Sequence, residues 1–475
     1  MSAVVAASTR ALGAPGPAQQ GHSIVSRWSA DGSLAPQLTT LTRLFLLTSF
    51  FDLFFIYPED IIVKKIVVVG AGIVGMSCAV ALRQKGHQVT VVDPELPGSQ
   101  CSFGNAGSLN GNAHFPSMAM LPKIPGMLLN PLEPLSIIWR DFPQMLPWFV
   151  RYLMHSRPSR TQAIALAAAS LNARVQSSMT DLLASVGAMD MLHWGGRMFA
   201  YRDQAGMAGD EPLMKLKFQA GIEMKKLTGD EARDMEPALG PLVDCAIFTP
   251  DAGHVVNPYR VVTVLADWMA GNGGTFSREK VVGFERQGMK VTGAVTSAGR
   301  IDADEFIIAS GAWSAKLAYM LGVRIPLIAE RGYHAMVASP GVTLTMPTMW
   351  MDRKIMVSPM EHGIRIAGLS EFGGADRSPN FEKMGHMLSS AQELLPAINL
   401  NQHQPWMGPR PATPDYLPVI GRSKALENVA FACGHGHSGL MFGPVTGKLV
   451  ASVIGGEAPG LDMKPFSPDR FGLFS

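Results

Sequence analysis

The feature that most constrains the fold is a glycine-rich turn joining a short apolar run to a helical pattern. Residues 66–69 read Ile-Val-Val-Val, which is typical of a strand buried on both faces of a parallel sheet. Gly-Ala-Gly-Ile-Val-Gly follows at 70–75, a helical pattern runs over 76–85, and a second apolar run at 89–92 ends in Asp93. Strand, glycine turn, helix and acidic strand end, in this order, predict a βαβ unit that binds a dinucleotide.

Each part of this motif has a physical role in holding a pyrophosphate. The first glycine permits the tight turn, the second lets the backbone approach the phosphates, and the third lets helix and strand pack closely. Backbone N–H groups at the helix start face the anion. An acid at 93 would bind a ribose diol and repel the additional phosphate of NADP. A turn without a ligand is the alternative, and the motif alone does not separate NAD from FAD. The residues predicted here are Val69, Gly70, Ala71, Gly72, Ile73, Val74, Gly75 and Asp93.

Two other glycine-rich segments resemble parts of a nucleotide site. A Gly/Asn/Ser loop, SFGNAG, follows the second strand at 102–107. Near the C-terminus, an apolar strand at 428–433 leads into GHGHSGLMFGP at 434–444, which opens a helix over 445–454. Exposed backbone N–H groups at such a helix start could hold the electron-rich pyrimidine edge of a flavin. The residues predicted to contact it are Ser102, Asn105, Ala106, Gly434, His435, Gly436, Gly439, Leu440 and Met441.

The order of motifs resembles the FAD-dependent D-amino-acid oxidase superfamily, most closely its bacterial D-amino-acid dehydrogenase branch. The segments that carry the resemblance are VVVGAGIVG (67–75), SFGNAG (102–107), PDAGHVVNPYR (250–260), ASGAWS (309–314), RGYH (331–334), RPATPDYLPVIG (410–421) and GHGHSGL (434–440). The resemblance implies FAD as the cofactor. It also implies adenine contacts from Val281 and Val282, and cofactor contacts from Ser310, Gly311 and Trp313. Because no cysteine lies between Cys245 and Cys433, the covalent link of sarcosine-oxidase relatives is not available, and noncovalent FAD is expected.

The predicted fold class is α/β, with a Rossmann-like FAD-binding domain interleaved with an antiparallel-sheet α+β substrate domain. Residues 63–115, 255–322 and 406–475 are assigned to the FAD-binding domain, and 116–254 and 323–405 to the substrate domain. A long helical pattern is expected over 161–186. Strands are expected over 193–201, 354–358 and 364–368, because alternating apolar residues there favour an antiparallel sheet.

The first 62 residues are predicted to be a disordered or spuriously translated extension. Up to about residue 37 they are rich in Ala, Gly, Ser, Pro and Gln. The apolar segment 44–57 carries Asp52 and is shorter than the roughly 18 to 20 residues needed to span a bilayer, which leaves a membrane-surface anchor as the alternative. The predicted location is cytoplasmic, with peripheral association at the inner face of the cell membrane as an option.

Charge and cysteine content exclude several classes of partner. Lys+Arg total 40 against Asp+Glu 38, so the formal net charge of +2 disfavours nucleic acid as a partner. The four cysteines are far apart without a C-x-x-C pair, which argues against a zinc site or a disulfide scaffold. One of His435 and His437 is expected to hydrogen-bond near the flavin and the other to be solvent-exposed, with no metal.

The resemblance implies hydride removal from the α-carbon of an amino acid to the flavin. An arginine would hold the substrate carboxylate through two parallel bonds, helped by a tyrosine hydroxyl. Arg410 is ranked first, Arg365 second and Arg331 third, with Tyr333 and Tyr259 as hydroxyl donors. In several relatives the carboxylate arginine lies on the strand matching 363–368, but the one-residue shift here would turn Arg365 away. For each arginine the alternative is closing a loop by binding backbone carbonyls. His334 either polarises the substrate or packs under the sheet.

The predicted reaction is oxidative deamination of D-amino acids to 2-oxo acids and ammonia. The electrons would pass to a quinone or another respiratory acceptor. An oxidase or dehydrogenase for glycine, sarcosine or hydroxyproline is the alternative within enzymes. A flavin-bearing subunit of a heteromeric complex that does not turn over substrate is the alternative outside them.

Overall fold

In the computed structural model, residues 62–109, 114–118 and 135–472 are described. The predicted βαβ unit opens this part of the chain. β1 (Lys65–Val69) pairs in parallel with β2 (Gln88–Val92), and α2 (Ile73–Gln84) connects them. The N-terminal segment predicted as an extension lies outside the described residues, apart from Ile62.

β1 lies inside a six-stranded sheet, the first of two main layers. Its order is β10-β2-β1-β14-β21-β20, and all neighbours are parallel except β20, which runs antiparallel to β21. A parallel sheet with crossover helices is the doubly wound arrangement, so the predicted fold class is confirmed. The further strands of this sheet are β10 (Thr275–Ser277), β14 (Glu305–Ile308), β20 (Val419–Arg422) and β21 (Val429–Cys433).

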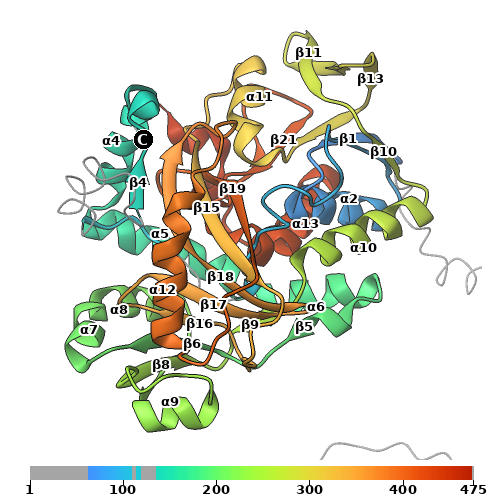
Figure 1. Cartoon of the computed structure of the whole chain (residues 1–475). Coiled ribbons are helices and arrows are strands. Elements are labelled where there is room, and N and C mark those ends of the chain that lie inside the picture. The colour runs from blue at the N-terminus through green and yellow to red at the C-terminus, as the bar shows by residue number, and fades with distance from the viewer. Residues whose placement is uncertain (1–61, 110–113, 119–134, 473–475) are drawn as a thin grey trace, which may run out of the picture. The chain divides into compact units, whose positions relative to one another are not determined.

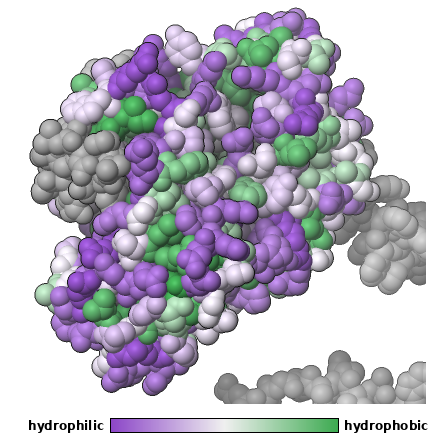
Figure 2. Space-filling view, viewed as in Figure 1, coloured by the Kyte–Doolittle hydropathy of each residue, from purple (hydrophilic) through white to green (hydrophobic). Residues whose placement is uncertain are grey.

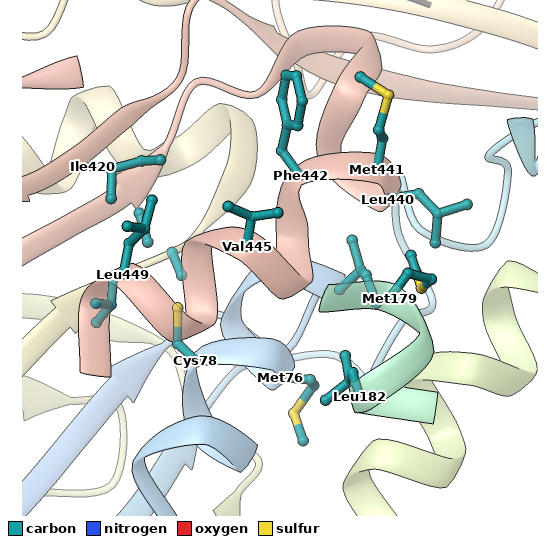
Figure 3. Packing of buried hydrophobic residues seen from close by; sticks show 14 of the residues in the cluster. Met76, Cys78, Met179, Leu182, Ile420, Leu440, Met441, Phe442, Val445 and Leu449 are labelled. Atoms are coloured by element: carbon teal, nitrogen blue, oxygen red, sulfur yellow. The ribbon is translucent and has the colours of Figure 1, made fainter. Parts of the chain in front are cut away.

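Helices α10 (Pro258–Gly271) and α13 (Gly439–Gly455) pack on α2, as the neighbouring blue, yellow-green and red ribbons of Figure 1 show. The contact between α13 and α2 is close, because a Cβ at Gly447 would lie only 2.5 Å from the carbonyl oxygen of Ser77. Figure 3 shows the apolar side chains of this core, among them Met76 of α2 and Val445 of α13. Among the described residues, 436–455 is the one segment long and apolar enough to cross a membrane, yet it is mostly buried in this core.

The long helical pattern after the first domain segment forms two helices instead of one. α5 (Pro158–Asn172) and α6 (Val175–Ser185) are separated by a break at 173–174. Asn172, buried at the end of α5, donates a hydrogen bond to the carbonyl of Ala220 and so fixes the chain at this break. Met179 and Leu182 of α6 pack toward α13 in Figure 3.

The second layer is a nine-stranded, mostly antiparallel sheet, drawn mainly in orange and green in Figure 1. Helix α12 (Met384–Leu394) covers one of its faces, and their apolar side chains share a core. The strand order is β19-β15-β18-β17-β16-β6-β8-β7, and β4 adds to β18. Their bounds are β4 (Leu135–Ile137), β6 (Arg197–Tyr201), β7 (Lys225–Thr228), β8 (Cys245–Thr249), β15 (Ile328–Val337), β16 (Thr348–Trp350), β17 (Ile355–Met360), β18 (Gly363–Gly373) and β19 (His403–Ala412).

The position of strand β19 differs from the predicted domain division. It pairs along its whole length with β15, so it belongs to the large sheet, and a boundary at 406 cuts through it. The sequence hid this pairing, because His403–Ala412 contains three prolines, which are disfavoured inside a sheet.

Two three-stranded sheets and several helices complete the described chain. The face seen in Figure 2 is largely hydrophilic with separate small hydrophobic areas, in keeping with a chain that buries its apolar residues. The small sheets are β11 (Val281–Gln287), β12 (Lys290–Thr296) and β13 (Arg300–Asp302), and β3 (Ser108–Leu109), β9 (Gly253–Val255) and β5 (Leu192–His193). The remaining helices are α4 (Phe142–His155), α7 (Gln204–Gly209), α8 (Glu211–Gln219), α9 (Gly229–Met235) and α11 (Ser314–Met320).

Candidate active site

A cavity of about 1270 Å³ has walls from both main sheets. Its lining starts at the glycine turn after β1, includes the loops after β2 and β21, and reaches strands β15, β18 and β19 of the large sheet. Pockets for drug-sized ligands measure about 300–1,000 Å³. The cavity is therefore large enough for a ligand bigger than a small metabolite.

The glycine turn forms one end of the cavity. Gly70 has φ +115°, and a Cβ there would lie 2.5 Å from the carbonyl oxygen of Ala309, so only glycine fits this turn. The Asp93 carboxylate lines the cavity and accepts hydrogen bonds from the backbone N–H groups of Ala71 (2.8 Å) and Glu95 (2.9 Å). Burial raises the pKa of Asp93. Predicted residues that line this end are Val69, Gly70, Gly72, Ile73, Val74, Asp93, Val281, Val282, Ser310, Gly311 and Trp313.

Two of the predicted turn residues lie behind this lining. Ala71 contributes its N–H to Asp93, and Gly75 packs on the turn, where a Cβ would lie 1.9 Å from the carbonyl oxygen of Gly70. Gly75 therefore serves the close packing of helix and strand that the motif predicts.

The loops at 102–107 and 434–441 form the middle of the cavity. Ser102 Oγ accepts a hydrogen bond from the N–H of Ile73 at 2.9 Å, which joins the first loop to the start of α2. His435 is buried with Nε2 2.9 Å from Thr446 Oγ1, and burial lowers its pKa to about 3. Predicted residues that line the middle are Ser102, Asn105, Ala106, His435, Gly436, Gly439 and Leu440, whereas Gly434 and Met441 pack behind it.

The residues present fit FAD. At Gly311 the φ is +54°, and no described atom lies within 4 Å of the position a Cβ would take, so the cavity reaches the backbone itself. The turn at 70–75 offers backbone N–H groups for a pyrophosphate, and Asp93 keeps lone pairs for a ribose. The start of α13 also lines the cavity, and its N–H groups suit the pyrimidine edge of the ring.

Arg410 is the one of the three predicted arginines that lines the cavity. Its side chain keeps 22% of its surface exposed. Nη1 donates to Ser370 Oγ at 3.3 Å and lies 3.6 Å from Glu330 Oε1. The guanidinium crosses the face of Gly332, because a Cβ on that residue would lie 2.0 Å from Arg410 Cζ. Arg410 is therefore placed to bind an anion in the cavity.

Arg365 and Arg331 lie outside the cavity lining, which corrects their assignment as carboxylate anchors. Arg365 faces the 102–107 loop and donates to the carbonyl oxygens of Phe103 (3.0 Å) and Asn105. Arg331 is fully buried, donates to the carbonyls of Arg377 and Ser378, and pairs with Glu371 at 3.1 Å. Both arginines therefore fit the alternative role, which is to close loops by binding backbone carbonyls. Residues of a strand alternate between faces, so Arg331 lies on the α12 side when Glu330 lies on the cavity side.

Two other predicted side chains, Tyr333 and His334, form hydrogen bonds with other parts of the protein. The Tyr333 hydroxyl donates to Glu371 Oε2 at 2.8 Å, although the residue touches the cavity wall. His334 Nδ1 donates to the carbonyl of Gly104 at 3.2 Å, its ring stacks on Trp406, and burial beside Arg365 and Arg410 lowers its pKa to about 3.

Tyr259, in the first turn of α10, contacts the Phe103 ring edge to face at 5.4 Å. It lies outside the cavity lining, so a role as hydroxyl donor to the substrate is not supported by its position.

Sequence reasoning missed a polar cluster around Glu330. Glu330 is buried in the cavity wall, where His437 Nε2 donates to its Oε1 at 2.8 Å and Ser370 Oγ donates to the same oxygen at 2.6 Å. The Tyr416 hydroxyl donates to Oε2 at 3.4 Å. His435 is buried, and His437 is half-buried with 19% of its side chain accessible, so the histidine expected to lie in solvent contacts Glu330 instead. The sequence signal that could have revealed this cluster is the alternation of side chains along a strand. In β15 it places residue 330 on the same face as residue 332.

Two buried cations at the far wall were also missed. Arg197 of β6 and Lys217 of α8 line the cavity, and both lie over the Phe199 ring, at 4.5 and 5.2 Å. Burial lowers the pKa of Arg197 to about 9 and that of Lys217 to about 7. Among the described residues, no three His, Cys, Asp or Glu side chains come together as a metal-binding group.

A parallel sheet with a glycine turn, joined through a large cavity to an antiparallel sheet, is the arrangement of a dinucleotide-binding protein. The family model of FAD dependent oxidoreductases matches residues 65–453, and that of pyridine nucleotide-disulphide oxidoreductases matches residues 3–101. The chain belongs to the family of FAD dependent oxidoreductases, and FAD is its cofactor.

Named relatives agree with this assignment. The chain is 33% identical to a D-amino-acid oxidase of Bradyrhizobium diazoefficiens over 86% of this chain and 99% of that protein. It is 30% identical to a D-amino acid dehydrogenase of Paramagnetospirillum magneticum over 86% and 99%. The glycine oxidase of Geobacillus kaustophilus superposes with a TM-score of 0.67 at 21% identity, covering 86% of this chain and 98% of that one, and so shares the fold.

Proposed function

We propose that this chain oxidises D-amino acids to 2-oxo acids and ammonia and passes the electrons to a quinone or another respiratory acceptor. The observation that carries the proposal is Arg410, whose guanidinium lines the same cavity as the loops suited to the flavin ring. The names of the two most similar relatives described above support the D-amino-acid class.

The residues of this chain would bind and orient the substrate. Arg410 would hold the carboxylate through two parallel hydrogen bonds, which fixes both the position and the direction of the α-carbon. Gly332 gives the guanidinium room to lie flat on the sheet. When bound, FAD supplies the acceptor for the α-hydrogen and its electron pair. Arg365 and His334 would hold the 102–107 loop against the sheet, because each donates to a carbonyl of that loop.

A panel of D- and L-amino acids added anaerobically to the purified holoenzyme tests the proposal. Bleaching of the flavin absorption band by several D-amino acids, but not by their L-enantiomers, is the expected result. Bleaching by glycine, sarcosine or hydroxyproline alone would replace the D-amino-acid assignment with the second enzyme class. Bleaching by none of them would indicate a flavin-bearing subunit without turnover.

The electron acceptor needs a separate measurement, because one relative is named an oxidase and the other a dehydrogenase. We expect the reduced enzyme to be reoxidised faster by a short-chain quinone than by dissolved oxygen. Fractionation of cells would test the accompanying proposal that the enzyme lies in the cytoplasm or peripherally on the inner face of the membrane.

A further inference from the structure

The Glu330 carboxylate is an anion held on the cavity wall by donors from four separate segments. Ser370 of β18 and Arg410 of β19 approach it from the sheet, Tyr416 from the turn after β19, and His437 from the loop before α13. Burial alone would raise the pKa of Glu330, but His437, Arg410 and Ser370 outweigh it and hold that pKa below its ordinary value. Glu330 therefore stays ionised and is a poor proton acceptor.

His437 is fixed by this carboxylate and by a second ring. Since Glu330 is an acceptor, Nε2 of His437 donates to it, and the neutral ring then has Nδ1 as its basic nitrogen. The His114 ring stacks on His437 at 4.1 Å with an interplanar angle of 21°. Both rings line the cavity, as Glu330 and Arg410 do.

The turn that brings Tyr416 to this cluster is conformationally strained. Tyr416 has φ +58°, one of two non-glycine residues in the described chain with a positive φ. A bulky side chain in the left-handed region costs free energy of about 1–3 kcal/mol and persists only where the surroundings impose it. Here the strained residue places its hydroxyl on Glu330 and its ring beside the two histidines. Such strain is common at functional sites.

The proposed reaction needs a proton acceptor at this place. An amino acid in neutral solution carries an α-ammonium group, and the α-hydrogen can leave with its electron pair only when a nitrogen lone pair is free to form the C=N bond. Arg410 would hold the carboxylate, and the α-ammonium group of the same substrate is only two bonds further along. Glu330 and His437 lie next to Arg410 on the same wall.

Resting on the proposed function, we propose that His437 is a catalytic residue that accepts the proton of the substrate α-ammonium group, and that Glu330 is its positioning residue. An N–H bond of the substrate breaks and an Nδ1–H bond forms, so the neutral imidazole becomes an imidazolium paired with Glu330. FAD, when bound, would supply the acceptor for the α-hydrogen and its electron pair, and the nitrogen lone pair would form the C=N bond of a protonated imine. Water hydrolyses the imine, and the imidazolium returns its proton to solvent.

Charged and titratable groups face His437 from several elements. Glu330 on β15 contacts the ring, Arg410 on β19 pairs with the same carboxylate, and the His114 ring stacks on His437. Arg197 and Lys217 add positive charge near His114, and Tyr416 is neutral because burial and Glu330 hold its pKa well above the ordinary value. Of these groups, the Glu330 carboxylate is the one in hydrogen-bond contact with the His437 ring.

The first test compares flavin bleaching by D-alanine in wild type and His437→Gln across pH under anaerobic conditions. We expect the bleaching rate of the variant at pH 7 to fall by about 10²- to 10⁴-fold, the usual contribution of a general base. The deficit should shrink as pH approaches the pKa of the free substrate amine, because the substrate then arrives neutral. His362→Gln changes an exposed histidine with 78% of its side chain accessible and should behave as wild type.

A binding measurement separates chemistry from structure. 2-Aminoisobutyrate carries the same carboxylate and ammonium groups but has no α-hydrogen, so it reports binding through the flavin spectrum without reduction. His437→Gln should bind it within a few-fold of wild type while losing bleaching. Added imidazole should restore bleaching in His437→Ala in proportion to its unprotonated fraction. Glu330→Gln, which removes the carboxylate that holds the His437 ring, should slow bleaching while 2-aminoisobutyrate still binds.

The outcomes distinguish the two proposals. If D-amino acids bleach wild type and the pH profile of His437→Gln is unchanged, or if imidazole does not rescue His437→Ala while 2-aminoisobutyrate still binds, His437 is not the proton acceptor. If no amino acid bleaches wild type, the proposed function fails first and the role of His437 falls with it.

Discussion

Replacing Gly332 with alanine should displace the Arg410 guanidinium without altering Arg410 itself. The new Cβ would lie 2.0 Å from Cζ and 2.1 Å from Nη2 of Arg410, whereas ordinary contacts begin near 3.4 Å. The guanidinium must therefore move by about 1.4 Å or more, and a misplacement of 1 Å can cost about 10²-fold in rate. The backbone at residue 332 is compatible with alanine, since its φ is outside the left-handed region.

The cost should appear in substrate binding and not in folding. The atoms that must shift belong to the far end of a flexible side chain, and an off-rotamer arginine costs about 0.5–1.5 kcal/mol. We expect Gly332→Ala to retain FAD and nearly its melting temperature, while the rate of anaerobic flavin bleaching at subsaturating D-alanine falls by about 10²-fold. Gly385→Ala, in an open position of α12, is the matched control.

The refuting result is a Gly332→Ala enzyme with wild-type kinetics. Because an unshifted guanidinium cannot coexist with the added methyl, this result would mean that Arg410 leaves its place without loss of function and is not the carboxylate anchor. Loss of FAD instead of substrate affinity would also contradict the assignment, since residue 332 lies at the substrate wall.

Three further predictions concern the arginines and the buried histidines. Arg410→Lys should weaken D-alanine binding by about 10- to 150-fold, the loss of one charge-assisted hydrogen bond, and leave D-alaninamide unaffected; equal losses for both ligands would exclude a carboxylate contact. Arg365→Met should lower FAD affinity, measured by flavin fluorescence, more than substrate affinity, because it leaves two loop carbonyls without their donor. His334, His435 and His254 have pKa values lowered by burial to about 3, 3 and 4, so their stabilising contribution is complete above the unfolded value of 6.5 and is lost as pH falls toward 4. Each should cost about 2 kcal/mol at pH 5, and a melting temperature that stays flat from pH 6.5 to 4.5 would contradict this.

The dinucleotide end was predictable because its signals are local. A glycine that must take φ +115°, a helix that starts three residues later and an acid after the next strand all lie within 30 residues of sequence. The glycine and the turn that requires it lie next to each other in the sequence. The fold class and the cofactor followed from this segment and its resemblance.

The substrate end was only partly predictable, because it depends on the register of three paired strands. Arg331 and Glu330 are adjacent in sequence, yet the alternation of faces along β15 places Arg331 with α12 and Glu330 in the cavity. The bulge between Tyr333 and His334 shifts the pairing with β18 and leaves Arg365 against the 102–107 loop. The residues around each arginine reveal neither the bulge nor which face of the strand turns toward the cavity.

The same register explains why the anchor and the proton acceptor are predicted to form one unit. Pairing of Glu330 with Arg410 across β15 and β19 fixes an anion beside a cation on the cavity wall. Alone, each charge would be costly to bury, but together they allow both to stay ionised at the surface of a cavity. A zwitterionic amino acid presents the complementary pair, with its carboxylate for Arg410 and its ammonium for the Glu330–His437 side. A substrate lacking either charge would leave Arg410 or the Glu330–His437 pair facing a ligand without the complementary charge. For this reason we expect the site to discriminate amino acids from simple acids and amines.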